Sequence, residues 1–439
     1  MESPNSEKVY SLNSKVNQRR TKVRYFIVFL LFLATIINYL DRANLSVVGP
    51  SIGKSLDLSA GEMGLIFSAF GWTYAIMQIP GGWILDRLGS KITYGFSLLI
   101  WSILTCFQGL ANGFGLLFGL RLGIGFSEAP AFPTNNRVVS TWFPQKERAF
   151  ATGVFTAGEY VGLGFLTPIL FWLLSTFGWE SVFIVSGAAG IIFSCVWLIK
   201  YNDPAKDKKV NQAELNYIRE GGGVVENKSE RSKISWSQVA SLFKHRQLIG
   251  IYIGQIGITA TLWFFLTWFP TYLVDEKHMT ILHVGFVAAI PYIAAFIGVL
   301  FGGFLSDWMI HCGISVSISR KLPIIIGLLL SSSIILANYT SSVPLVITIM
   351  SIAFFAQGMA AISWTMVSEI APPELMGLAG GVFNFAGNLS SIIVPIVIGF
   401  IVGATHSFGG ALAFVAAIAV IGALSYIFIV GEVKRVKME

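Results

Sequence analysis

Apolar runs long enough to cross a membrane recur along the chain, and no other feature limits the fold as strongly. A helix needs about 20 apolar residues to span the hydrocarbon core of a bilayer. Runs of about this length lie between turn signals, six before a charged stretch and six after it. They fall near 25–48, 61–85, 91–110, 114–139, 148–174, 178–200, 246–273, 281–305, 322–340, 343–367, 375–402 and 407–431. The pattern predicts an all-α membrane protein with 12 transmembrane helices in two six-helix bundles.

Charge supports this class and predicts an orientation. Only 12% of the 439 residues are charged, against about 25% in soluble proteins. The net charge of +7 does not point to nucleic acid, because basic residues of membrane proteins gather in cytoplasmic loops. Here they gather in 1–24, between 200 and 246, and in 432–439, whereas the short loops on the other side hold only Lys54 and Lys277. We expect a multi-pass protein of the inner or plasma membrane with both termini cytoplasmic.

The same pattern divides the chain into two bundles, two tails and a linker. The predicted parts are a tail at 1–24, a bundle at 25–200, a linker at 201–245, a bundle at 246–431 and a tail at 432–439. The linker is too short to be a domain. Its end, from Ile234 to Arg246, mixes apolar and basic residues. That mixture fits either a helix lying on the inner membrane surface or a plain solvated linker.

One internal repeat relates the two halves. The stretch G-G-W-I-L-D-R-L-G-S-K at 81–91 closes the second run, and G-G-F-L-S-D-W at 302–308 closes the eighth. Duplicated six-helix halves are typical of transporters whose site lies between the halves. We expect the acids and bases of the repeat to act as an inner gate. The gate residues predicted are Gly82, Asp86, Arg87 and Asp307.

Ionisable residues inside the runs are few, and all lie in the first half: Asp41, Arg42, Arg121, Glu128 and Glu159. A charge at the centre of a membrane helix costs at least about 2.5–3.5 kcal/mol on insertion scales, so such residues usually mark a functional site. The alternative is a neutralised pair that locks two helices together.

Helical spacing predicts which of these charges meet. Arg121 and Glu128 are seven residues apart, which places them on nearly one face with about 10 Å of rise between them. Asp41 and Arg121 are both predicted in the outer half of their spans, at similar depth. Carboxyl groups in such a setting suit proton coupling. We expect Arg121 to tune their proton affinity, because a nearby cation favours the ionised form. Glu128 could alternatively be a structural partner of Arg121.

Several stretches resemble one family. They are N-Y-L-D-R at 38–42, G-F-S-E-A-P-A-F-P at 125–133, L-W-F-F-L-T-W-F-P at 262–270 and G-G-V-F-N-F-A-G at 380–387. The chain resembles the major facilitator superfamily over 23–434, and within it the anion:cation symporters that carry sugar acids, such as bacterial D-galactonate:proton symporters. The resemblance implies uptake of a sugar acid with protons by alternating access.

The resemblance also implies roles for single residues. Asp41 and Glu128 match the protonation positions of the sugar-acid symporters, and Arg42 matches the residue expected to bind the substrate carboxylate. An arginine suits that role because its planar fork binds a carboxylate with two hydrogen bonds and stays charged. Tyr39 and Tyr74 could hydrogen-bond the same carboxylate, or could serve only in aromatic packing.

The second half offers uncharged partners for the hydroxyl groups of a sugar acid. The candidates are Gln255, Ser363, Asn384 and Asn388, beside Trp364. Gln255 and Asn384 fall where family members line the cavity. The alternative is that these side chains hydrogen-bond one helix to another.

Glu159 departs from the galactonate pattern, which has glutamine at this position. An ionised glutamate only accepts hydrogen bonds and would repel a substrate carboxylate. Glu159 could be protonated, pair with Arg42 or serve as an additional proton site.

The function expected is import of an aldonate such as D-galactonate by a monomeric carrier in the lipid bilayer. No cofactor is expected beyond the coupling protons, and no metal site. Alternatives are a glucarate, galactarate or hexuronate symporter, or an anion exchanger with Arg42 and Arg121 as paired ligands. A receptor on a carrier scaffold would usually need a sizeable signalling domain. No loop carries a nucleophile–base set or a metal-ligand cluster, so an enzyme is not expected.

Overall fold

The structure, a computed structural model, describes residues 19–224, 241–372 and 375–436. Within these ranges the chain forms helices and no strands, as the apolar runs predict. The N-terminal bundle consists of α2 (Val23–Ser55), α3 (Ala60–Gln108), α4 (Phe114–Glu128), α5 (Ala131–Trp142), η1 (Gln145–Glu147), α6 (Arg148–Phe165), α7 (Thr167–Phe177) and α8 (Trp179–Lys200).

The C-terminal bundle repeats this plan. It consists of α11 (Arg246–Thr267), α12 (Phe269–Thr271), η2 (Tyr272–Glu276), α13 (Ile281–Val287), α14 (Ala289–His311), α15 (Val316–Ser331), η3 (Ser332–Tyr339), α16 (Val343–Ala360), α17 (Ser363–Ile370), α18 (Met376–Thr405), α19 (Gly409–Leu424) and η5 (Ser425–Ile429). Ten of the described helices or joined helices are long and apolar enough to span a membrane.

The other two predicted spans are present in a different form. The helix α3 holds both the second and the third span, and Gly89 separates them at a φ of 76°. Glycine suits that left-handed conformation because it has no Cβ. The fourth span is divided into α4 and α5 at Ala129 and Pro130. Alone, α4 and α5 are each too short to span a membrane, but together they form the fourth span. With the two spans of α3, the described helices agree with the twelve-span pattern.

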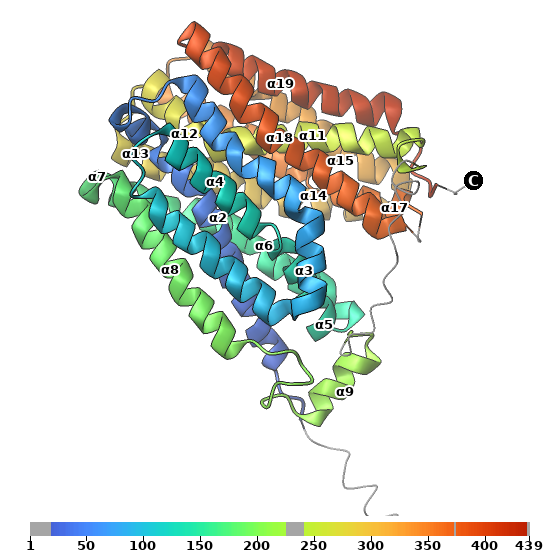
Figure 1. Cartoon of the computed structure of the whole chain (residues 1–439). Helices are drawn as coiled ribbons and strands as arrows, with labels where there is room; N and C mark the ends of the chain where they lie inside the picture. Colours follow the sequence, from blue (N-terminus) through green and yellow to red (C-terminus); the bar gives the residue numbers. More distant parts are fainter. Residues whose placement is uncertain (1–18, 225–240, 373–374, 437–439) are drawn as a thin grey trace, which may run out of the picture.

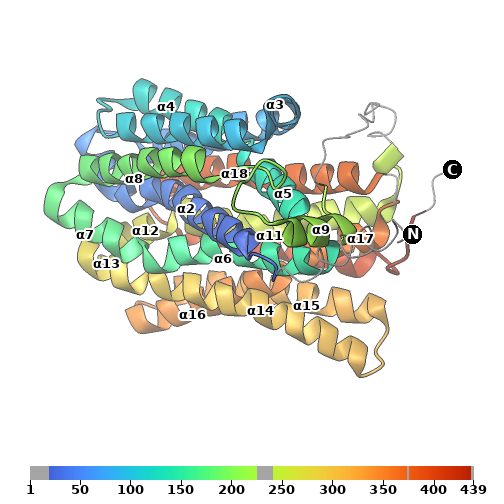
Figure 2. The same ribbon diagram turned by 90° about the horizontal axis from the view of Figure 1, so that it is seen from below.

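The two bundles pack side by side, coloured blue to green and yellow to red in Figure 1. In the view of Figure 2, α3 and α4 form one edge, α14, α15 and α16 form the opposite edge, and α2 and α11 lie between them. Contacts between the bundles join α3 to α18, α2 to α11 and α12, α6 to α14, and α7 to α13.

These contacts lie toward the end of the helices that is far from the chain termini. Ser46, late in α2, donates a hydrogen bond of 3.0 Å to the backbone oxygen of Thr267 at the end of α11. Gly64 packs so closely on α18 that a Cβ there would lie 2.6 Å from the backbone oxygen of Pro395. Small residues allow such close helix approach. The bundles therefore meet closely at the end opposite the tails.

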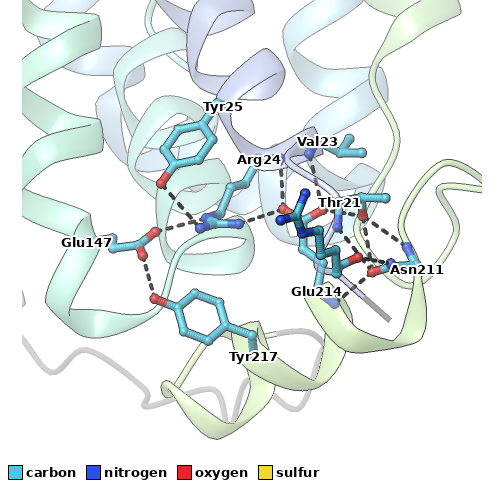
Figure 3. Close-up of polar contacts among 9 residues, drawn as sticks. Thr21, Val23, Arg24, Tyr25, Glu147, Asn211, Glu214 and Tyr217 are labelled. Atoms are coloured by element: carbon cyan, nitrogen blue, oxygen red, sulfur yellow. Dashed lines mark hydrogen bonds and ion pairs between the residues drawn. The ribbon is translucent and has the colours of Figure 1, made fainter. Parts of the chain in front are cut away.

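The central linker holds a helix that the sequence analysis did not predict, α9 (Gln212–Glu220). Its Glu214 is fully buried against the start of α2. The carboxylate accepts hydrogen bonds from the hydroxyl of Thr21 at 2.6 Å and from the backbone N–H of Val23 at 3.1 Å, and it pairs with Arg24 at 2.8 Å (Figure 3). The first N–H groups of a helix lack partners within it and favour a negative charge. Glu214 therefore caps α2 from the linker.

A second carboxylate completes this cluster. Arg24 also pairs with Glu147 of η1 at 2.9 Å, and Glu147 accepts a hydrogen bond from the hydroxyl of Tyr217 in α9 (Figure 3). The cluster holds the first part of the linker on the N-terminal bundle. Of the membrane-surface helix considered for 234–246, residues 234–240 lie outside the described residues, and Leu242 is buried in the core of the C-terminal bundle.

Candidate functional site

The centre of the N-terminal bundle holds an ion pair between Arg42 of α2 and Glu128 at the end of α4. The Nε and one terminal nitrogen of Arg42 donate to the same oxygen, Oε1 of Glu128, at 2.8 and 2.6 Å. Glu128 is fully buried and Arg42 is 8% exposed. The structural alternative paired Glu128 with Arg121. In the structure the ion-pair partner of Glu128 is Arg42 instead.

Three aromatic rings surround the guanidinium of Arg42. Its central carbon lies 4.9, 5.0 and 5.1 Å from the ring centres of Tyr39, Phe70 and Tyr74. Cations are attracted to such ring faces. Both predicted tyrosines therefore contact Arg42, and Phe70 is a member of the site that the sequence analysis missed. The ring of Phe70 also lies 6.3 Å from that of Trp263 in α11, which places the pair beside the other bundle.

Asp41 is the neighbour of Arg42 in the sequence but faces other helices, because successive side chains of a helix are about 100° apart. The indole N–H of Trp101 donates to its Oδ2 at 3.0 Å, and the amide of Asn44 donates to its Oδ1 at 3.2 Å. The same amide donates to the hydroxyl of Ser186 in α8 at 2.5 Å. Sequence reasoning missed these three partners. The one signal in the sequence was a polar residue, Asn44, three positions after Asp41 in the same apolar run.

Arg121 of α4 is buried and forms no ion pair among the described residues. It is 3% exposed and its guanidinium lies 5.5 Å from the ring centre of Phe70. It is close enough to Asp41 and to Glu128 for electrostatic interaction with both. Its Nε has no hydrogen-bonding partner in the described part of the chain. This geometry suits a residue that tunes the acids, and that role stays a prediction.

Glu159 of α6 lies near Tyr39. Its carboxyl group contacts the hydroxyl of Tyr39 and interacts electrostatically with Arg42. The side chain of Glu159 is partly exposed. Of the three possibilities considered for this residue, an ion pair with Arg42 is absent among the described residues, in which Arg42 pairs with Glu128. Tyr39 thus lies near both the third acid and the arginine.

The uncharged candidates of the second half form two small groups. The hydroxyl of Ser363 in α17 donates to Oε1 of the buried Gln255 in α11 at 3.0 Å. In α18, the amide of Asn388 donates to the backbone oxygen of Asn384 at 2.9 Å. Trp364 is 49% exposed and packs edge-on against Phe383. The Gln255–Ser363 bond joins two helices, whereas the ring of Trp364 is partly exposed.

The repeat residues form pairs inside each bundle. Asp86 pairs with Arg137 at 3.1 Å, and Asp307 pairs with Arg320 at 2.9 Å. Arg87 lies over the ring of Trp83, 4.3 Å from its centre. A Cβ at Gly82 would meet no other helix among the described residues. Their role as a gate stays a prediction. Among the described residues no three His, Cys, Asp or Glu side chains gather as a metal site.

Residues 31–395 match the family described as the Major Facilitator Superfamily. The chain belongs to the Major Facilitator Superfamily. This membership confirms the predicted fold and the prediction of a transporter rather than an enzyme. Together with the apolar helices, it also confirms a multi-pass membrane protein.

Two relatives within the superfamily are similar over nearly their whole length. A D-galactonate transporter of Escherichia coli O6:H1 is 48% identical over 417 residues, covering 94% of this chain and 97% of the relative. A probable galactarate/D-glucarate transporter, GudP of Bacillus subtilis, is 48% identical over 431 residues, covering 96% of this chain and 95% of the relative. The predicted resemblance to sugar-acid transporters is confirmed.

Solved structures share the superfamily fold at low identity. A bacterial homologue of the human lysosomal transporter Spinster, in an inward-facing and occupied conformation, has a TM-score of 0.69 at 20% identity, with 94% of this chain and 96% of that chain covered. The nucleoside transporter NupG has a TM-score of 0.68 at 15% identity, with 92% and 99% covered. At these identities the likeness concerns the fold alone.

Proposed function

We propose that this protein imports a sugar acid into the cell together with protons, with both termini on the cytoplasmic side. The named substrates of the two 48% identical relatives support the substrate class. The positive charge of the tails and linker supports the orientation. The observation that carries the coupling is the buried pair in which Glu128 occupies the fork of Arg42. The expected carrier needs no cofactor and works as a monomer.

Protonation of Glu128 links the proton to the anion. The two Arg42 nitrogens that hold Glu128 are the donors that a substrate carboxylate would need. Charge-assisted bonds of this kind are stronger than bonds to a neutral acceptor. A proton on Glu128 therefore weakens its hold on Arg42 and lets the sugar-acid carboxylate take its place. Release of that proton reverses the exchange and expels the substrate.

The packing of the bundles supports release on the side of the tails. The close contacts lie at the opposite end, where Ser46 meets Thr267 and Lys54 meets Asp275. The ion pairs nearer the tails, such as Asp86–Arg137 and Asp307–Arg320, stay within one bundle. With the tails in the cytoplasm, this arrangement corresponds to an inward-facing state. Import then requires a second state in which the outer contacts separate.

Uncharged groups of the second half would select the polyol chain. Gln255, Ser363 and Asn384 supply amide and hydroxyl groups, and Trp364 supplies an exposed ring. Because the second half offers no buried charge at these positions, we propose an aldonate with one carboxylate, such as D-galactonate, as the substrate. Galactarate and glucarate, each with a second carboxylate, are the alternatives to be tested.

Transport by the purified protein in proteoliposomes tests this function. Counterflow and uptake driven by an inward proton gradient are measured for D-galactonate, gluconate, galactarate, glucarate and hexuronates. We expect saturable counterflow of an aldonate and accumulation that depends on the proton gradient. Uptake that needs a substrate inside but no gradient would identify an exchanger instead. Saturable transport of none of these compounds would overturn the sugar-acid proposal.

A further inference from the structure

A column of buried polar side chains runs inside the N-terminal bundle with a spacing of seven residues. Seven residues rise about 10 Å along a helix and return to nearly the same face. The column on α3 consists of Tyr94, Trp101 and Gln108, and the column on α4 and α5 consists of Asn135, Glu128 and Arg121. All six are at most 3% exposed. The two helices are antiparallel neighbours, so the two columns run side by side.

The helix α2 connects these columns at their middle. Asp41 accepts the hydrogen bond from Trp101, and Asn38, three residues earlier, lies beside Glu128. Toward the tails, the hydroxyl of Tyr94 faces the amide of Asn135 and lies within electrostatic range of Glu128. The polar groups thus extend from the middle of the bundle toward its tail end.

Many polar atoms of this set have no partner in the protein. Among the described residues, they include the hydroxyl of Tyr94, both amide atoms of Asn38, Oε2 of Glu128 and Oδ1 of Asn135. Buried polar groups in proteins are almost always hydrogen-bonded, and internal water is the usual partner where several lie together. One Glu128 oxygen is held by Arg42, whereas the unpaired one is available to water.

Beyond the column, a set of packed aromatic rings extends from Tyr94 toward the tail-side surface. The ring of Tyr94 lies 4.7 Å from that of Trp197, which stacks on Tyr201 at 4.4 Å. The hydroxyl of Tyr201 donates to the carboxylate of Asp203 at 3.2 Å. Asp203 is partly exposed and follows the end of α8. It therefore offers an acceptor where the column reaches the surface.

We propose that the N-terminal bundle contains its own hydrated proton path, from Glu128 past Asn38 to Tyr94 and Asn135 and out at Asp203, separate from the substrate route between the bundles. The inference rests on the proton coupling proposed above. The groups that face Glu128 are Arg42, Asp41 and Asn38 of α2, Tyr74 and Tyr94 of α3, and Arg121 of α4. Of the groups on its tail side, the Tyr94 hydroxyl is the one that both accepts and donates a proton.

The chemistry of the path is a relay without net change in the side chains. The proton leaves the Glu128 carboxyl group to water, and the Tyr94 hydroxyl accepts a proton from one water while it donates its own to the next. That water carries the proton to Asp203 or to bulk water, because the rings between Tyr94 and Asp203 carry none. The Asn38 and Asn135 amides orient the water and are not themselves protonated. A sugar acid cannot enter this path, because its members are packed inside one bundle.

Tyr94→Phe tests the path by removing the relaying hydroxyl and little else. Gradient-driven uptake and substrate-dependent proton influx, followed with a pH dye inside proteoliposomes, should fall about a hundredfold, as expected when a positioned proton-transfer group is lost. Counterflow should stay close to that of the parent, because exchange needs no net proton movement. Tyr426→Phe is the matched control, since Tyr426 is equally buried with an unpaired hydroxyl but lies in the other bundle.

Asn135→Leu provides a second test of the path and keeps a similar side-chain shape. It tests the path alone if Tyr94→Phe does not fold. It should show the same separation of proton influx from counterflow, whereas Tyr426→Phe should behave like the parent. Normal proton influx in both path variants overturns the path. A parallel loss of counterflow in a folded variant also overturns it, because the residue would then serve the substrate route. A parent protein that accumulates substrate without any proton influx overturns the proposed coupling itself.

Discussion

Arg42 directs two nitrogens, Nε and a terminal one, at a single oxygen of Glu128, and the other oxygen of that buried carboxylate has no partner among the residues that the structure describes. Such a pair is stable only while both charges are present, because either charge alone would be buried without compensation. The geometry therefore makes protonation of Glu128 and ligand binding by Arg42 depend on each other.

Glu128→Gln should separate exchange from accumulation. A glutamine is the neutral isostere of protonated glutamate, so Arg42 stays available to the substrate while no proton is carried. We expect counterflow to persist and gradient-driven accumulation to fall by about two orders of magnitude, the scale typical of a lost proton-transfer group. Both rates are measured with radiolabelled substrate in proteoliposomes.

Glu180→Gln is the control for this change, because Glu180 is an exposed acid of the same bundle at the start of α8. It should leave both rates unchanged. Full accumulation in Glu128→Gln would remove Glu128 from the coupling. If Asp41→Asn also kept full accumulation, the assignment of both acids would fail.

Removal of Arg42 should reveal the energetic coupling of the pair. Arg42→Met leaves Glu128 buried without its partner, which costs about 3–5 kcal/mol in comparable buried pairs. We expect a lower Tm in detergent at pH 8 and loss of substrate binding. The double variant Arg42→Met/Glu128→Gln should regain much of the stability but not the binding. Equal Tm values for the single and double variants would show that the pair is not coupled.

Arg42→Lys separates charge from geometry at the same position. A lysine supplies one point charge and cannot present the planar fork. We expect the KM for the sugar acid to rise about tenfold or more, in line with the loss of one charge-assisted hydrogen bond. An unchanged KM would mean that the carboxylate is bound elsewhere.

The fold was predictable because its main signal is periodic and strong. Each membrane span needs a long apolar run, and the twelve runs correspond to the helices of the two bundles. The boundaries that were missed lie where a local feature interrupts the pattern. Gly89 permits α3 to carry two spans, and the division between α4 and α5 falls at Pro130. Such breaks depend on backbone angles that hydropathy does not encode.

The site was predictable in its residues but not in its pairing. Arg42, Glu128, Asp41 and Arg121 stand out because charges are rare inside spans. Which arginine meets Glu128 depends on the rotation of α2 against α4, and spacing along one helix cannot fix that rotation. The partners of Asp41 were missed for a related reason, since Trp101 is one of 12 tryptophans and nothing in the sequence marks its N–H.

The contact between the linker and the first helix should contribute measurable stability. Glu214→Ala removes the cap of α2 and one partner of the buried Arg24. Loss of a buried acceptor of this kind costs about 1–3 kcal/mol, so we expect a lower Tm in a fluorescence melt. Glu220→Ala, an exposed acid of the same helix, is the control and should have no effect. Equal Tm values for the two variants would show that the cap is unimportant.

Cross-linking of the two bundles at their closed end should stop transport. Lys54 of α2 and Asp275 of η2 form an exposed ion pair of 3.5 Å between the bundles. Cysteines at both positions, in a background where Cys106, Cys195 and Cys312 are replaced by serine, can be joined by a short bifunctional thiol reagent. Alternating access requires this end to open, so we expect uptake and counterflow to be abolished after cross-linking. The single-cysteine variants, treated with the same reagent, should transport normally. Full transport by the cross-linked protein would mean that these ends do not separate during the cycle.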